Sequence, residues 1–402
     1  MASAPVVLIE GPRSVGKSSI LRDVARARGV PVIDLDDPPT RAAVAADPSV
    51  AVSGRDLICI DEYQRVPEVL DAIKAELNKG AVPGRFVLAG STRHDSLPRQ
   101  AQALTGRLTR LTVYPFTQGE IGGVEEDFVT TALATPAALV TSRTSSTARS
   151  DYVARVCAGG FPLALRAATE PARRTWFDNY VKLSLGRDAL ELSRLRQGDK
   201  LLGLLRRVTG QTGQLLNMEG AGAPIGLTQQ TADSYVALLE KLFLVYRLEA
   251  WGKTLFARAI RTPKVHVLDS GVGARLLRLT TSKVTPANAT ALTEYGHLLE
   301  TFVVTEILKQ ASFAGDVADY GHFRTKDGEE VDLVIETGEG GIVGFEVKAG
   351  AQVSSKDLNG LRRLQRIAGD SFLGGVTLYT GPRAYTVGAA LHVVPIDRLW
   401  TP

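Results

Sequence analysis

A phosphate-binding pattern near residue 11 constrains this chain more than any other feature. The apolar run Val6–Ile9 is typical of a buried strand, and after Glu10 the chain reads Gly-Pro-Arg-Ser-Val-Gly-Lys-Ser. This is the Walker A pattern, G-x-x-x-x-G-K-S, whose backbone N–H groups face the phosphates of a nucleotide. The residues predicted to bind ATP are Gly11, Pro12, Arg13, Ser14, Val15, Gly16, Lys17, Ser18 and Ser19. Lys17 is expected to reach the β- and γ-phosphates, and Ser18 to bind Mg²⁺.

A second apolar run, Leu57–Ile60, ends in two acidic residues, Asp61 and Glu62. A strand that ends in acids is the Walker B pattern of a P-loop protein. Asp61 is predicted to hold Mg²⁺ through water, and Glu62 to polarise the water that attacks the γ-phosphate. An acidic turn that only terminates the strand is the alternative.

Two further positions are candidates for contact with the reacting phosphate. The segment Arg85–Ala89, with four apolar residues after the arginine, predicts a strand between the two Walker strands, so Ser91 could touch the γ-phosphate or the attacking water. A turn cap is the alternative role for Ser91. Arg107, with Arg110 nearby, offers a guanidinium that suits a transition-state contact across a subunit boundary in a homo-oligomer. A solvated or structural arginine is the alternative there.

Composition excludes several classes of protein. With 402 residues, 44% of them hydrophobic and 22% charged, the chain is expected to form two or three globular domains. Two cysteines, Cys59 and Cys157, fit neither a disulfide framework nor a zinc site, so we expect a cytoplasmic protein. The first strand begins too early to leave room for a signal peptide, and no apolar run could span a membrane. A net charge of +4 is compatible with nucleic-acid binding without indicating it.

The sequence predicts three domains, with bounds 1–150, 151–285 and 286–402. The Ala/Thr/Ser-rich segment from Val124 to Ser150 is expected to be a loop or loosely packed linker, and helical patterns follow from residue 151 to 208. The segment Gly226–Leu242 resembles the helix pair of a winged helix-turn-helix, with Leu244–Leu248 as a wing strand. Such a module could contact DNA through Gln230, Ser234 and Lys241, or act as a spacer between proteins.

A second group of charged residues lies in the C-terminal part. Glu300 falls in a predicted helix, Asp332 in a strand, and Glu346 and Lys348 on one face of the next strand, with a Gly-rich turn between the strands. Carboxylates at Glu300, Asp332 and Glu346 could bind Mg²⁺ or Mn²⁺, and Lys348 could stabilise charge on a scissile phosphate. The spacing resembles that of PD-(D/E)xK nucleases, of the restriction-endonuclease-like fold. A polar strand face without a ligand is the alternative.

In combination, these motifs resemble the AAA-type ATPases of the additional-strand, catalytic-Glu class that carry a C-terminal domain of unknown function (the 4143 class). The motifs are Gly-Pro-Arg-Ser-Val-Gly-Lys-Ser, Ile60-Asp61-Glu62, Ala89-Gly90-Ser91, Thr105-Gly106-Arg107 with Tyr114-Pro115-Phe116 and Glu120, and Gly159-Gly160-Phe161-Pro162. The resemblance covers nearly the whole chain. Together with the segment and strand patterns above, the resemblance predicts an α/β fold with a P-loop NTPase parallel-sheet domain, a helical and winged-helix-like middle, and a PD-(D/E)xK-like α/β C-terminal domain.

We therefore expect an ATP-binding and ATP-hydrolysing, DNA-associated enzyme with a metal-dependent, nuclease-like C-terminal domain. Its cofactors would be ATP and Mg²⁺, with Mn²⁺ as a further option at the C-terminal site. The alternative is a nucleotide-controlled signalling switch or regulatory partner, in which the C-terminal domain binds DNA or protein without cleavage.

Overall fold

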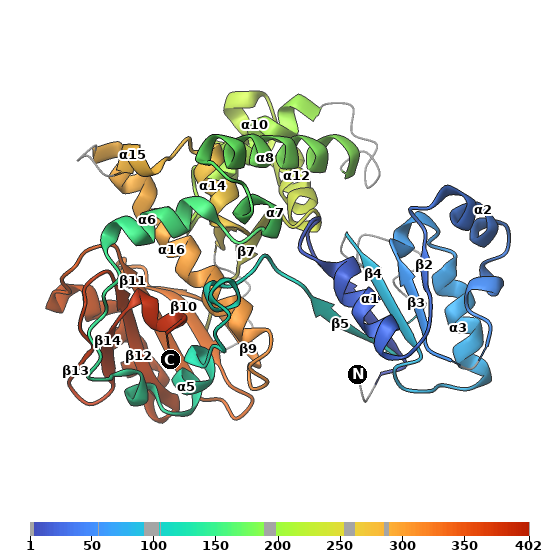
Figure 1. The fold of residues 1–402 in the computed structure, drawn as a ribbon. Helices are drawn as coiled ribbons and strands as arrows, with labels where there is room; N and C mark the ends of the chain where they lie inside the picture. Colours follow the sequence, from blue (N-terminus) through green and yellow to red (C-terminus); the bar gives the residue numbers. More distant parts are fainter. Residues whose placement is uncertain are drawn as a thin grey trace. The chain divides into compact units, whose positions relative to one another are not determined.

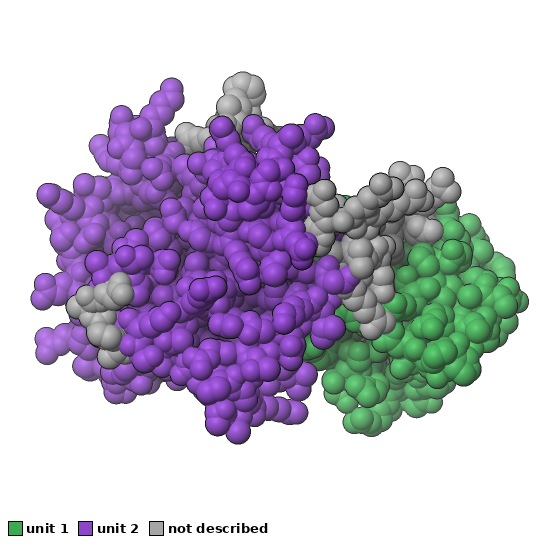
Figure 2. All heavy atoms as spheres, turned by 90° about the horizontal axis from the view of Figure 1, so that it is seen from above, with its two compact units in different colours: residues 1–115, 188–194, 241–243 green, residues 116–187, 195–240, 244–402 purple. Residues whose placement is uncertain are grey.

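The computed structural model describes residues 4–54, 56–91, 104, 106–188, 198–252, 262–284 and 289–401. The chain divides into two compact units (Figure 2). The first comprises residues 1–115, 188–194 and 241–243, and the second comprises residues 116–187, 195–240 and 244–402.

The first unit is built on a parallel sheet with strand order β2-β3-β4-β1-β5 (Figure 1). Its elements are β1 (Val6–Glu10), α1 (Lys17–Ala27), β2 (Val32–Asp34), α2 (Pro38–Ala46), the 3₁₀ turn η1 (Pro48–Ala51), β3 (Ile58–Asp61), the 3₁₀ turn η2 (Tyr63–Arg65), α3 (Val69–Lys79), β4 (Phe86–Gly90) and β5 (Leu108–Thr112). All four strand pairings are parallel. The predicted position of β4 between the two Walker strands is confirmed.

Strand β1 is apolar from Val6 to Ile9, and helices cover both faces of the sheet at these residues. Val6 and Leu8 belong to a core with residues of α3, including Ile73. Val7 and Ile9 belong to the opposite core, with residues of α1 such as Leu21. A strand that is buried on both faces has a continuous run of hydrophobic residues, and such a run made β1 predictable from the sequence.

The second unit contains a helical region, a small sheet and a larger sheet (Figure 1). Its first elements are α4 (Gln118–Gly122), α5 (Phe128–Ala134), η4 (Pro136–Leu139), α6 (Arg149–Ala158), α7 (Pro162–Leu165), α8 (Glu170–Leu183), α10 (Gly198–Thr209), β6 (Gln214–Leu215), α11 (Met218–Gly222), η6 (Ala223–Ile225), α12 (Gln229–Lys241), β7 (Val245–Leu248) and β8 (Lys264–Val267). A π-helical turn, η5 (Ser184–Asp188), follows α8. Strands β6, β8 and β7 form an antiparallel sheet in that order.

The remaining elements build the C-terminal part. They are α14 (Ser270–Leu276), α15 (Thr281–Val284), α16 (Ala289–Ala311), β9 (Asp319–Arg324), β10 (Glu330–Glu336), β11 (Ile342–Lys348), η7 (Ser355–Leu358), α17 (Asn359–Ala368), η8 (Gly369–Ser371), β12 (Phe372–Tyr379), β13 (Tyr385–Val387), β14 (Leu391–Pro395) and η9 (Ile396–Leu399). Their six strands form a mixed sheet of order β13-β14-β12-β11-β10-β9. Strands β9, β10 and β11 are antiparallel, and β12 runs parallel to β11.

The prediction of a loop or loosely packed linker from Val124 to Ser150 is wrong in part, because this segment contains α5. Phe128 of α5 is fully buried, and its ring centroid lies 6.0 Å from that of Phe345 in β11. The segment belongs to the second unit, which begins at Phe116. Short apolar stretches between Ala and Thr residues carry little periodicity, which hid the helix.

Helices α6, α7, α8 and α10 agree with the helical patterns expected from residue 151 to 208, apart from residues 189–197, which lie outside the described residues. The domain boundary expected at residue 285 also lies outside them, as does Thr105 of the predicted motifs. Across the described ranges, no helix combines the length and apolar character needed to cross a membrane.

Candidate functional site

The Walker A loop follows β1 at the carboxyl edge of the first sheet, as predicted. Gly16 has φ of 101° and caps the N-terminus of α1. A Cβ on Gly11 would lie 2.1 Å from the carbonyl oxygen of Val113, so no other residue fits there. The buried Lys17 ammonium donates a hydrogen bond to the carbonyl oxygen of Pro12, 2.6 Å away. The chain thus curls tightly around the lysine that is expected to meet the phosphates.

Asp61 ends strand β3 and lies against the Walker A serine. Burial raises the pKa of the Asp61 carboxyl, and hydrogen bonds from Ser18 and from the backbone N–H of Glu62 oppose that rise. The two residues predicted to share Mg²⁺ are therefore adjacent. A hydroxyl and a carboxylate oxygen are suitable ligands for that ion, directly or through water.

Glu62 lies beside Ser91, which follows strand β4. The Ser91 hydroxyl is 3.4 Å from Oε2 of Glu62. Glu62 has φ of 51°, the left-handed conformation that is uncommon for a residue with a side chain. Burial raises the pKa of Glu62 above its usual value, although the charges of Arg13 and Lys17 oppose this rise. A carboxyl at this position is suited to accept a proton from an attacking water.

The sequence analysis missed Gln64. Its amide nitrogen donates a hydrogen bond to Oε2 of Glu62 and another, 3.2 Å long, to the hydroxyl of Ser91. Gln64 thus links two residues that come from different strands. The one available signal was a polar side chain two positions after the Walker B glutamate.

Arg107 lies at the amino-terminal end of the parallel strands, whereas the Walker A loop lies at their carboxyl end. The carbonyl oxygen of Arg107 accepts a hydrogen bond from Val6, the first residue of β1, whereas the Walker A loop follows the last. The Arg107 guanidinium donates to Oδ1 of Asn78 at 2.8 Å. The structure therefore does not bring Arg107 to the nucleotide site of its own chain. Its role across a subunit boundary stays a prediction.

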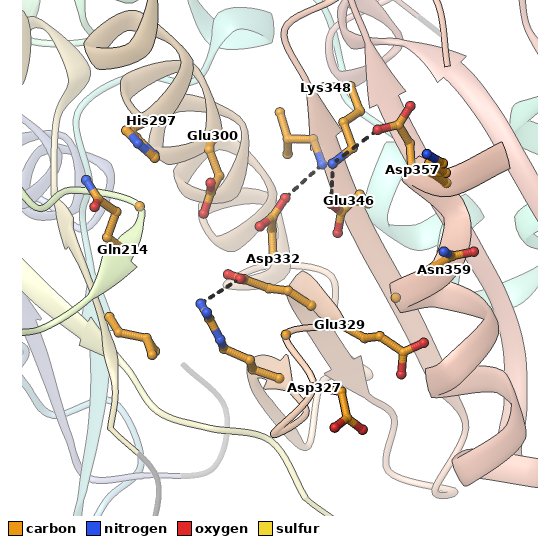
Figure 3. Close-up of a pocket in the computed structure, with 18 residues that line it drawn as sticks. Gln214, His297, Glu300, Asp327, Glu329, Asp332, Glu346, Lys348, Asp357 and Asn359 are labelled. Atoms are coloured by element: carbon orange, nitrogen blue, oxygen red, sulfur yellow. Dashed lines mark hydrogen bonds and ion pairs between the residues drawn. The ribbon is translucent and has the colours of Figure 1, made fainter. Parts of the chain in front are cut away.

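The four residues of the predicted C-terminal site line one cavity of about 790 Å³ in the second unit (Figure 3). Glu300 comes from α16, Asp332 from β10, and Glu346 and Lys348 from β11. The pairing of β10 with β11 and the helical placement of Glu300 are as predicted. We refer to this cavity as the acidic pocket, since Asp327, Glu329, Glu330 and Asp357 also line it.

A register shift in β10 aims Asp332 into the acidic pocket. The pairing of β10 with β9 is irregular between Val331 and Val334, and both of these valines pack into the core formed with α17. Simple alternation would place Val331 and Val334 on opposite faces. Bulges of this kind re-aim side chains beside functional sites. Oδ2 of Asp332 accepts a hydrogen bond from the backbone N–H of Val347, 2.9 Å away.

Lys264 is the residue of this site that the sequence analysis missed. It lies on β8 of the small sheet, and only 1% of its surface is exposed. Its ammonium is 2.7 Å from Oε1 of Glu300 and 2.8 Å from Oδ1 of Asp332. It also lies 2.5 Å from Oε1 of Glu330. A single lysine in a four-residue strand gave no indication that three carboxylates distant in sequence surround it.

The charges in the acidic pocket act strongly on one another. Burial and the neighbouring Asp332 raise the pKa of Glu300 well above its usual range. Burial acts in the same direction on Asp332, but the Lys264 charge and hydrogen bond outweigh it and lower the Asp332 pKa. Burial, together with Asp332, raises the pKa of Glu346 to about 8, although Lys348 donates to its Oε1 at 2.7 Å. Of these three residues, Asp332 is thus the one whose carboxyl ionises most readily.

Two of the three predicted metal ligands have oxygen atoms of the kind that bind divalent cations. Asp332 and Glu346 offer oxygen ligands, and Oε2 of Glu346 is buried without a hydrogen-bond partner. Glu300 does not converge with them on an open position, because Lys264 lies between Glu300 and Asp332. Within the described ranges, no three His, Cys, Asp or Glu side chains are arranged so that they could hold a metal ion.

Three family models match separate parts of the chain. Residues 3–122 match the model of an AAA domain. Residues 149–283 match a domain of unknown function (DUF8612), and residues 295–399 match another (DUF4143). The chain therefore combines an AAA-type P-loop ATPase domain with a C-terminal domain of the DUF4143 kind, which confirms this part of the sequence-based prediction.

Whole-chain relatives are also found. Uncharacterized proteins of Mycobacterium bovis and Mycobacterium tuberculosis are 26% identical over 400 residues, which cover 99% of this chain and 81% of each relative. Among solved structures, a Walker-type ATPase of Pyrococcus abyssi is 14% identical over 68% of this chain and 91% of its own, with a TM-score of 0.39. The Thermotoga maritima RuvB Holliday junction branch migration motor is 17% identical over 60% of this chain and 81% of its own, with a TM-score of 0.27.

Proposed function

We propose that this chain is an ATP-hydrolysing enzyme in which Lys17 and Ser18 bind the phosphates and Mg²⁺ while Glu62 activates water. One observation carries the proposal: Glu62 and Ser91, from adjacent strands, meet at the sheet edge where Ser18 contacts Asp61. Mg²⁺, when bound, would neutralise charge that develops on the phosphates. The residues of the chain would hold the nucleotide, orient the water and accept its proton.

We further propose that the acidic pocket is a nuclease-like site. The element order α16-β9-β10-β11-α17-β12, with the antiparallel strands β9 to β11 and β12 parallel to β11, resembles the core of restriction-endonuclease-like folds. The positions of Glu300, Asp332, Glu346 and Lys348 within that order match the PD-(D/E)xK pattern. A divalent metal, when bound, would polarise a phosphodiester, and Asp332 and Glu346 would hold it.

The small sheet and its helices support association with DNA. The order α10-β6-α11-α12-β7-β8, with β8 between β6 and β7, resembles a winged helix. Gln230 and Ser234 are exposed on α12, the helix that would meet DNA in such a module. Their side chains are polar but uncharged, so we expect contacts with phosphate or base edges to add modestly to affinity.

ATP turnover by the purified chain, with and without DNA, tests the proposal. We expect Mg²⁺-dependent hydrolysis that Lys17→Ala removes and that DNA increases. Hydrolysis that DNA leaves unchanged would remove the support for a DNA-associated enzyme. A wild-type chain that binds ATP but does not hydrolyse it would contradict the enzymatic assignment.

A second candidate function is a nucleotide-controlled switch whose C-terminal domain binds without cutting. The observation in its favour is Lys264, which compensates carboxylates that a nuclease would use for metal. DNA binding without cleavage of any DNA form, with either Mg²⁺ or Mn²⁺, would favour this candidate.

A further inference from the structure

We infer that the ammonium of Lys264 is an internal counter-cation of the acidic pocket. A divalent metal ion must displace this ammonium in order to bind Asp332 together with Glu346. The inference rests on the metal-binding role proposed above. It goes beyond that role because it names a side chain of the protein, on the small sheet, that competes with the metal ion.

The geometry sets the two cations in competition. The Lys264 ammonium lies between Oε1 of Glu300 and Oδ1 of Asp332, at 2.7 and 2.8 Å. The other oxygen of Asp332 accepts the N–H of Val347. Both Asp332 oxygens are therefore engaged, and a metal ion on Oδ1 would lie against an ammonium. An ammonium and a metal ion that contact the same carboxylate oxygen lie close together, and in a buried site they repel each other strongly.

The pocket also contains an unsatisfied ligand atom. Oε2 of Glu346 is buried and has no hydrogen-bond partner, while Oε1 is taken by Lys348. Glu346 lines the same cavity as Asp332, and its strand pairs directly with β10. A buried carboxylate oxygen without a partner is costly, and a cation between Glu346 and Asp332 would satisfy it.

The strand that carries Lys264 is fixed against the helix that carries Glu300. The hydroxyl of Thr301 in α16 lies 3.0 Å from Nδ1 of His266 in β8 and 2.8 Å from the hydroxyl of Thr212. Thr212 in turn accepts a hydrogen bond from the backbone N–H of Val267. All of these contacts are buried. Displacement of the ammonium therefore requires rotation of the long lysine side chain rather than movement of the strand.

Titration of the full chain with Mn²⁺, followed by calorimetry without nucleotide, tests the inference. Asp332→Asn defines the part of the signal that belongs to the acidic pocket. We expect Lys264→Met to bind Mn²⁺ in the pocket at least about tenfold more tightly than wild type, because the competing charge is gone. Lys356→Met is the matched control, since Lys356 lines the same cavity but is exposed. Its effect should stay below about threefold because solvent and salt screen that charge.

Loss of Lys264 leaves the carboxylates of Glu300, Glu330 and Asp332 without their shared cation and could prevent folding. The comparison is therefore repeated in the Glu300→Gln background, which removes one of these charges. The double variant should again bind Mn²⁺ at least about tenfold more tightly than Glu300→Gln alone.

The outcomes separate the inference from the proposed function. Tighter binding in both backgrounds supports the competition. Equal Mn²⁺ affinity with and without Lys264, lost in Asp332→Asn, would overturn the competition and leave the metal site standing. No Asp332-dependent binding in any variant would overturn the metal site, and the inference with it.

Discussion

The nucleotide site of the first unit and the acidic pocket of the second are assembled in different ways. The first is made from short segments that each follow a parallel strand: the Walker A loop after β1, Glu62 after β3 and Ser91 after β4. The second takes its side chains from β8, α16, β10 and β11, and one of them is a lysine whose ammonium contacts three carboxylates. A site at one sheet edge depends on local sequence, whereas a pocket of this kind depends on tertiary packing.

The largest effect should come from Glu62. We expect Glu62→Gln to lower ATP turnover roughly 10²- to 10⁴-fold while ATP still binds, because water activation and nucleotide binding are separate tasks. Lys17→Ala should instead weaken ATP binding, since its ammonium meets the phosphates. Single-turnover hydrolysis and equilibrium binding of ATP measure the two effects. Hydrolysis by Glu62→Gln at the wild-type rate would exclude Glu62 as the general base.

The acidic pocket should appear in the pH dependence of stability. The pKa of Glu346 rises from 4.5 to about 8 on folding, so the folded state holds its proton more tightly than the unfolded state. The favourable contribution of this proton is present at acidic pH and is lost as pH rises from about 5 to 8. Wild type should therefore lose about 3 kcal/mol relative to Glu346→Gln across that window, without metal.

Urea unfolding of both proteins at several pH values measures this difference. Glu339→Gln, in the exposed turn before β11, is the control and should follow wild type. Parallel stability profiles for wild type and Glu346→Gln would mean that Glu346 is not protonated preferentially in the folded protein.

The way in which each site is assembled determines how much of it the sequence could predict. The parallel strands and the Walker residues were predictable, because Val6–Ile9 and Leu57–Ile60 are continuous apolar runs that end in recognisable loops. Asp332, Glu346 and Lys348 were predictable as neighbours from strand alternation and one glycine-rich turn.

Three features were not predictable. Lys264 joins the site only because β8 packs against α16, a contact without any local signal. The bulge in β10 alters its alternation between Val331 and Val334. Arg107 follows a glycine and sits near other basic residues, but only the strand register shows that it lies at the edge away from the nucleotide.

A smaller effect is expected at Gln64, a positioning residue that holds Glu62 and Ser91 together. Gln64→Ala should lower kcat for ATP about tenfold, the value of a hydrogen bond to a charged group, and leave KM unchanged. Steady-state kinetics separate the two parameters. A rise in KM without a change in kcat would indicate that Gln64 supports nucleotide binding rather than the position of the general base.

The smallest effect should be at Arg107. Since its guanidinium bonds Asn78 at the far edge of the sheet, Arg107→Ala should change ATP turnover by less than about twofold in the isolated chain. Turnover is measured alone and in mixtures with wild type. A large loss that also poisons wild-type protein would instead show that Arg107 acts across a subunit boundary.

One experiment tests most directly whether the chain carries two separate active sites. ATP hydrolysis and plasmid nicking are measured in the same reactions with Mg²⁺ or Mn²⁺, for wild type, Glu62→Gln and Asp332→Asn. We predict that wild type does both, that Asp332→Asn hydrolyses ATP without nicking DNA, and that Glu62→Gln loses ATP hydrolysis. Equal nicking by wild type and Asp332→Asn, or none by wild type with either metal, would contradict the assignment of the acidic pocket as a nuclease site.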